Sequence, residues 1–117
     1  MIPSRVFTSG LNSLSVLSIC WDGVTDLTAT GSTSSDALAL TSVFNQVSTT
    51  AASTGVMLPS TEMGEDIVVA NDGANTLTVY PQSGSTIDGS ASVSIAAGKR
   101  RIFFAFSNTL WISLLGA

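Results

Sequence analysis

Residues 67–81 place the strongest constraint on what this chain can fold into. Two runs rich in β-branched residues flank the polar segment Asn71–Asn75 (NDGAN). In the second run, Leu77 and Val79 alternate with more polar residues, which is the period-two pattern of a half-buried strand. Asn, Asp and Gly are the residues that tight turns favour. The stretch therefore predicts a β-hairpin and an all-β fold.

Similar strand-like segments recur along the rest of the chain, separated by turn residues. Their spacing of about 8 to 12 residues is typical of a sandwich or barrel. We expect an antiparallel β-sandwich, jelly-roll-like, over residues 24–117, and an extended N-terminal arm over residues 1–23. No internal repeat is visible. Besides the hairpin arms, strands are predicted at residues 24–30, 55–59, 92–95, 102–106 and 110–115.

Two segments need a separate interpretation. Residues 36–47 fit a helix, because apolar residues recur at i, i+3, i+4 and i+7 from Leu40, and they also fit two short strands. The β-branched residues after Val43 favour strands. In the hairpin at residues 102–115, the alternation predicts a core of Phe104, Phe106, Leu110, Ile112 and Leu114, with Phe103, Trp111 and Leu115 pointing outward.

The composition indicates a surface that something else covers. Charged residues make up 10% of the chain, against about 25% in ordinary soluble domains. Most polar side chains are instead hydroxyls, from 19 serines and 14 threonines, and the mean hydropathy of the chain is +0.45. Because the cores of interfaces are depleted in charge, homo-oligomer or lattice contacts are the simplest explanation, and a Ser/Thr-rich monomer is the alternative.

Charge and cysteine content exclude several classes of protein. The net charge is −4 with four basic residues, so a nucleic-acid partner is not expected. The one basic cluster, residues 99–101, is either a solvated loop that protects the following strand from aggregation or a salt-bridging patch for an acidic neighbour. Cys20 is the single cysteine, which rules out an intrachain disulfide.

The uncharged segment 102–117 is shorter than the roughly 20 apolar residues of a membrane span, so no membrane contact is expected.

The sequence offers little for catalysis. The chain has no histidine, which removes Ser-His-Asp chemistry and the commonest zinc ligand, and it contains no glycine-rich phosphate loop. Asp72 and Asp88 lie in turns next to glycines, where Asp normally bonds the backbone. We therefore expect no enzyme activity, no cofactor and no metal. Trp21, Tyr80 and Trp111 could stack on sugar rings, although packing is the simpler role for them.

Several segments together resemble a recurring module of tailed-bacteriophage virion structural proteins. The resemblance covers about residues 24–115. The segments that carry it are residues 28–33 and 36–40, Gly55–Pro59, Ile67–Pro81, Gly84 with Ile87-Asp88-Gly89, Ile95–Lys99 and Trp111.

A single small β domain with an apolar arm is most similar to a capsid decoration (cement) protein. The resemblance implies a homotrimer bound to the major capsid protein on the outer surface of the phage head, made in the host bacterial cytoplasm. The alternative is a head-fibre or tail component that binds a receptor or glycan. The residues expected to contact other subunits or the capsid are Ile2, Arg5, Val6, Phe7, Leu11, Leu14 and Trp111.

Overall fold

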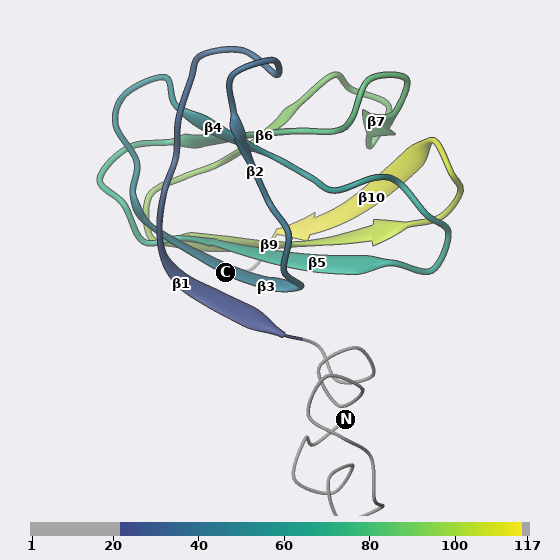
Figure 1. Ribbon diagram of the computed structural model, residues 1–117, viewed down its shortest axis with the longest axis horizontal. Coiled ribbons are helices and arrows are strands. Elements are labelled where there is room, and N and C mark those ends of the chain that lie inside the picture. The colour runs from purple at the N-terminus through teal and green to yellow at the C-terminus, as the bar shows by residue number, and fades with distance from the viewer. Residues whose placement is uncertain (1–21, 116–117) are drawn as a thin grey trace, which may run out of the picture.

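The computed structural model describes residues 22–115, which form ten β-strands in two sheets. The sheets lie face to face as two layers around one core (Figure 1). Residues 22–115 contain no helix, and therefore none that could cross a membrane. The all-β class predicted from the sequence is confirmed.

The two sheets differ in size. The six-stranded sheet has the order β1 (Gly23–Thr28), β3 (Phe44–Thr49), β5 (Asp66–Asn71), β9 (Lys99–Ala105), β10 (Leu110–Leu115) and β7 (Thr86–Ile87). The four-stranded sheet has the order β2 (Leu38–Ala39), β4 (Gly55–Met57), β6 (Leu77–Tyr80) and β8 (Val93–Ile95).

The first six strands wind between the sheets like the coils of a solenoid. Strands β1, β3 and β5 pair in parallel in one sheet, and β2, β4 and β6 pair in parallel in the other. Each connection crosses to the opposite layer, so consecutive strands do not pair with each other. Gly23 pairs with Phe44, 21 positions later, and Phe44 pairs with Val68, 24 positions later. These unequal coils explain why the sequence shows no repeat.

Two expectations about pairing require correction. The stretch 67–81 is not a hairpin, because β5 belongs to the six-stranded sheet and β6 to the four-stranded one. The sheets are also mixed and solenoid-like rather than antiparallel throughout as in a jelly roll: only the pairs β5–β9, β9–β10 and β6–β8 are antiparallel. A turn signal shows where the chain reverses, but pairing depends on which long-range neighbour the strand meets.

Residues 36–47 form strands and not a helix. Strand β2 pairs in parallel with β4, and β3 lies between β1 and β5. Val47, in the middle of β3, is fully buried. The preference for strands in this segment is confirmed, and its β-branched residues account for it.

The core fills the space between the sheets with mostly aliphatic side chains. Trp111 and Phe103 are its largest fully buried members. The complete buried cluster comprises Ala29, Leu40, Val47, Val56, Leu58, Ile67, Val69, Leu77, Val79, Ile87, Ile95, Phe103, Ala105 and Trp111.

The faces predicted for the last hairpin are wrong, although β9 and β10 do pair antiparallel. Phe103 and Trp111 point inward and are fully buried, whereas Phe106 and Leu114 are 65% and 60% exposed. Leu115 is exposed, as predicted. Both faces of this hairpin are apolar, so the alternation shows two faces without showing which one meets the core. A shift of one residue exchanges them.

A buried polar corner closes the turn between β5 and β6. Asn71 is fully buried; its Oδ1 accepts hydrogen bonds from the Thr50 hydroxyl (2.8 Å) and the Gly73 amide (3.1 Å). Its Nδ2 donates to the carbonyls of Asn75 (2.8 Å) and Ile95 (2.9 Å). A Cβ at Gly73 would clash with Thr50. Asn71 thereby ties the end of β5 to the segment after β3 and to β8.

Replacing Asn71 with Ala should therefore destabilise the fold strongly. The Thr50 hydroxyl, the Gly73 amide and two carbonyls would lose their partner inside the protein, so we expect a loss of about 2–4 kcal/mol in the free energy of unfolding. Urea unfolding followed by circular dichroism measures this loss. Asn108→Ala, which removes one exposed contact to the Met63 amide, is the control and should cost less than about 1 kcal/mol. Equal losses in the two variants would contradict the role of Asn71.

Candidate functional site

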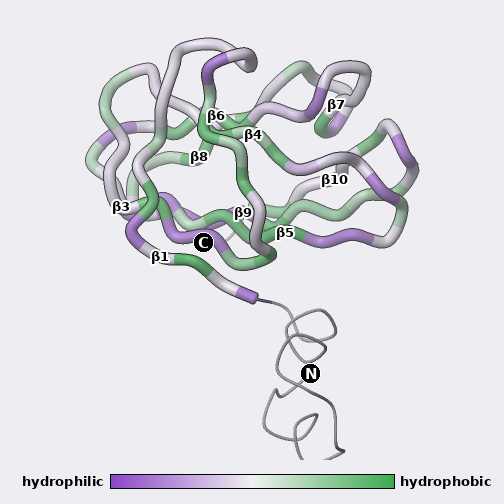
Figure 2. The backbone as a smooth tube through the Cα atoms, in the orientation of Figure 1, coloured by the Kyte–Doolittle hydropathy of each residue, from purple (hydrophilic) through white to green (hydrophobic). Residues whose placement is uncertain are grey.

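The outer face of the six-stranded sheet carries an apolar surface that faces away from the core. Its residues alternate along their strands with buried ones, as Val68 does with Ile67 and Val69. In Figure 2 hydrophobic colouring runs through β5 and β9 in the middle of the sheet. We call this surface the apolar face, and it consists of Phe44, Val68, Ile102, Phe104, Ile112 and Leu114.

The strand register places these side chains directly beside one another. Phe44 pairs with Val68, Val68 with Ile102, and Ile102 with Leu114, which makes one row across β3, β5, β9 and β10. Side chains opposite each other on neighbouring strands lie within contact distance. With a strand separation of about 4.8 Å, the row is about 14 Å long. Phe104 and Ile112 form a second, shorter row beside it.

Polar and charged groups border the apolar face at both ends of the strands. Asp66 pairs with Phe104 at one end. At the other, Arg100 lies 3.6 Å from Asp72, whose second carboxylate oxygen accepts a hydrogen bond from Gln46 (2.9 Å). A continuous apolar area with a polar border is typical of a protein-binding surface.

A shallow depression of about 230 Å³ lies beside this surface, where β1 meets β3 and β5. Its lining includes Val24, Val68 and the buried Asn45. The Asn45 side chain donates to three carbonyls, but within residues 22–115 its Oδ1 has no hydrogen-bond partner. Asn45 alternates with the exposed Phe44 and shares the inner face of β3 with Val47, so this oxygen is buried and not open to a partner at the apolar face.

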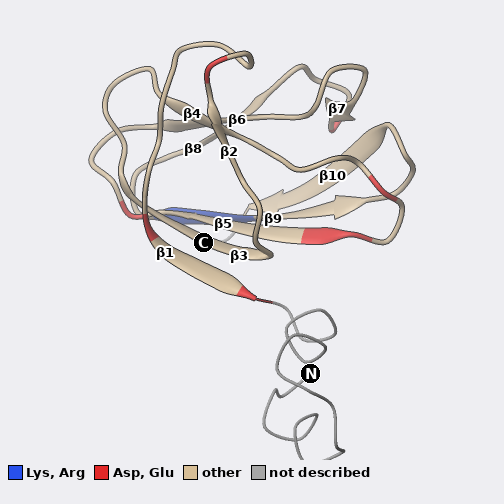
Figure 3. Cartoon of the chain, viewed as in Figure 1, with Lys and Arg blue, Asp and Glu red and all other residues tan. Residues whose placement is uncertain are grey.

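Two of the three basic residues of the described chain, Arg100 and Arg101, make ion pairs within the protein. Lys99, Arg100 and Arg101 lie together at the start of β9 (Figure 3), in a strand and not in a loop. Arg101 lies 3.6 Å from Asp88 and donates from Nε to the Ser113 hydroxyl (2.8 Å). Burial alone would raise the pKa of Asp88, but hydrogen bonds from Ser113 and the Arg101 charge outweigh it and hold that pKa below its usual value.

Three acidic residues lie around the start of β5: Glu62 and Glu65 precede the strand, and Asp66 begins it. Burial, reinforced by the charges of Glu62 and Asp66, raises the pKa of Glu65. Over residues 22–115, no group of three or more acidic, cysteine or histidine residues could hold a metal ion.

The residues predicted to contact other subunits or the capsid fall into two groups. Six of them lie in the arm, outside the described residues: Ile2, Arg5, Val6, Phe7, Leu11 and Leu14. Trp111 is described, and the prediction that it points outward to a partner is wrong, because its side chain has 0% exposure. Its indole N–H donates to the Thr61 hydroxyl (2.9 Å), which in turn donates to Ser85 (2.8 Å). Trp111 therefore joins the core to two loops.

Sequence reasoning missed the apolar face itself. Phe104, Ile112 and Leu114 were predicted to be core residues, and Phe44, Val68 and Ile102 were not singled out for a function. The available signal was a strand apolar on both sides, Ile102-Phe103-Phe104-Ala105-Phe106, in a chain with few charges. A strand of this kind is expected to be buried on both faces, by the core on one side and by another element or partner on the other.

A Trp111→Phe variant tests the core position of this residue. The loss of the bond to Thr61 and of ring volume should lower the free energy of unfolding by about 2–3 kcal/mol, measured by urea denaturation. Phe106→Leu, a change at an exposed aromatic residue, should change it by less than about 0.5 kcal/mol. An unchanged stability in Trp111→Phe would overturn the core assignment.

Comparisons with protein-family models, with curated proteins and with solved structures gave no match.

Proposed function

We propose that this chain is a non-enzymatic decoration (cement) protein of a tailed-phage capsid, which binds the outer surface of the assembled head and stabilises it. The observation that carries the proposal is the apolar face, whose central row crosses four neighbouring strands of one sheet. The sequence resemblance to virion structural proteins is the reason for proposing a phage capsid as the assembly to which the chain binds. The partner is the major capsid protein, and the location is the capsid surface.

Attachment through the apolar face fits the chemistry of the surface. Leu114 is 60% exposed and Ile102 is 37% exposed, and each is the direct neighbour of the other across β9 and β10. Covering such side chains gains about 25 cal/mol for each Å² of apolar area removed from water. The polar border formed by Asp66, Asp72 and Arg100 would set the orientation of the partner more than the affinity.

The proposed assembly is a homotrimer in which the N-terminal arm adds contacts to neighbouring subunits. The arm leads directly into β1, the edge strand of the six-stranded sheet. Its apolar residues include Val6, Phe7 and Leu11. Three linked subunits would bind the head by avidity, since dissociation requires all contacts to break at once.

A structural role also agrees with the contacts of three of the eight described acids. Asp36 closes a turn, Asp72 bonds Gln46, and Asp88 is held by Ser113. These carboxylates support the backbone and neighbouring strands. Two sheets packed on one core give the rigid scaffold that a cement protein needs, as a jelly-roll sandwich would.

Polar substitution in the apolar face should weaken attachment to heads. We expect the double variant Ile102→Thr/Leu114→Ser to bind at least about tenfold more weakly, because it removes apolar contact at the centre of the surface. Co-sedimentation with purified heads lacking this protein measures the affinity. Met63→Ser is the control, because Met63 is 74% exposed but lies outside the apolar face. Wild-type binding by the double variant would reject the face as the attachment surface.

Deletion of residues 2–14 tests the arm separately. This deletion should release the protein from heads, because it removes the arm's contacts to neighbouring subunits. The far-UV circular dichroism should remain that of a β protein, since every described strand begins at or after Gly23. Full occupancy of heads by the shortened chain would show that the arm is dispensable.

A further inference from the structure

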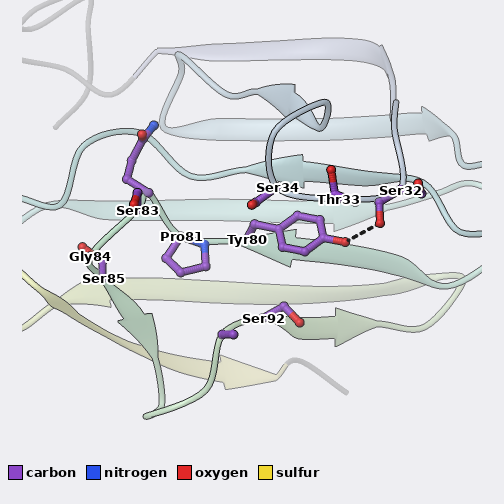
Figure 4. Close-up of a pocket in the computed structure, with 11 residues that line it drawn as sticks. Ser32, Thr33, Ser34, Tyr80, Pro81, Ser83, Gly84, Ser85 and Ser92 are labelled. Atoms are coloured by element: carbon purple, nitrogen blue, oxygen red, sulfur yellow. Dashed lines mark hydrogen bonds between the residues drawn. The ribbon is translucent and has the colours of Figure 1, made fainter.

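The other layer of the molecule carries a groove of about 460 Å³ on its outside. Tyr80, at the end of β6, lies in it, with the turn that contains Ser32, Thr33 and Ser34 on one side and Ser92 on the other (Figure 4). Six serine or threonine side chains line the groove together with Tyr80, Pro81 and Gln82, and none of the lining side chains is charged.

The aromatic ring in this groove is held in place. The Tyr80 hydroxyl donates to the Ser32 carbonyl (3.2 Å). The ring packs over Gly55 of β4, where an added Cβ would come within 2.8 Å of the Tyr80 Cε2 atom. Tyr80 is nevertheless only half-buried. A fixed ring that stays partly open to solvent is suited to stacking on a ligand.

One wall of the groove is also held rigidly by hydrogen bonds. The Asp36 carboxylate accepts bonds from the amides of Ser32 (3.1 Å) and Thr33 (2.9 Å) and from the Thr33 hydroxyl (2.9 Å). These bonds, chiefly those of Thr33, lower the pKa of Asp36. The carboxylate therefore stays ionised, and able to accept these bonds, at more acidic pH than an ordinary Asp.

Several hydroxyls of the groove remain available to a ligand. In the described part of the chain, the side chains of Ser34, Ser83 and Ser92 make no hydrogen bond to protein. Each hydroxyl can donate one hydrogen bond and accept two. With no cationic or carboxylate side chain in the lining, the groove does not suit phosphate or a metal ion.

We propose that this groove binds neutral carbohydrate, with a sugar ring stacked on Tyr80 and its hydroxyl groups bonded to Ser34, Ser83 and Ser92. A neutral sugar matches both features of the groove: its apolar ring face can stack on the Tyr80 ring, and its hydroxyl groups can bond the serine hydroxyls. The groove lies on the layer of the four-stranded sheet and the apolar face on that of the six-stranded sheet. These are the two layers seen in Figure 1. A subunit attached to a capsid through one could therefore present the other outward, and the proposal does not depend on capsid attachment.

The test is a titration of the isotope-labelled full chain with maltotriose and with N,N′-diacetylchitobiose, followed by NMR. At sugar concentrations up to about 10 mM, which detects millimolar affinity, at least one of the two should shift the resonances of residues 32–34, 80–85 and 91–92. Sialyllactose serves as the charged comparison and should bind more weakly, since no cation lines the groove.

Three variants decide whether the groove is responsible. Ser34→Leu should weaken binding at least about fivefold, by removing a hydroxyl and narrowing the groove. Ser60→Leu, at another exposed serine outside the groove, is the matched control and should bind as the wild type does. Tyr80→Leu should abolish binding, and Ser34→Leu keeps the test decisive if Tyr80→Leu does not fold. No shift in the groove with either neutral sugar, or equal binding by Ser34→Leu and the wild type, would overturn the proposal.

Discussion

The hydrogen bonds of the buried Asn71 side chain hold the corner at which the chain crosses from β5 to β6, and they join both halves of the fold. Every coil of the N-terminal half must leave one sheet and enter the other, and its backbone polar groups have to find partners at the corner. Asn71 supplies them for the coil after β5, where it bonds backbone groups of Gly73, Asn75 and Ile95 and also the Thr50 hydroxyl. Its bond to Ile95 also joins the solenoid-like half to β8 and the antiparallel half of the fold.

The same winding produces a molecule with two chemically different outer surfaces. The six-stranded sheet presents Val68, Ile102 and Leu114 in register, a surface that favours a protein partner. The four-stranded sheet presents Tyr80 within a hydroxyl-lined groove. Few charges are needed on either surface, which gives a physical reason for the low charge content and the many serines of the chain.

Much of the local structure was predictable, because it depends on neighbouring residues. The strands at residues 55–57 and 93–95 lie within predicted segments, and turn chemistry does surround Asp72. The β9–β10 hairpin was also predicted, although β9 begins at Lys99 and not at Ile102. The roles within that turn were not predictable. Asn71 and not Asp72 is the buried bonding group, and Gly73 is required by its close approach to Thr50. Both facts depend on a segment about twenty residues earlier in the chain.

By itself, the sequence determined that the chain is a β protein with few charges and no histidine, since composition and a period of two residues are local properties. Only the tertiary structure decided which sheet each strand joins and which face of β9 meets the core. A strand with Phe103 on one side and Ile102 and Phe104 on the other satisfies the pattern in either orientation. Packing determines the orientation of the strand. Phe103 and Trp111 fill the space between the sheets, which leaves Ile102 and Leu114 on the outer surface.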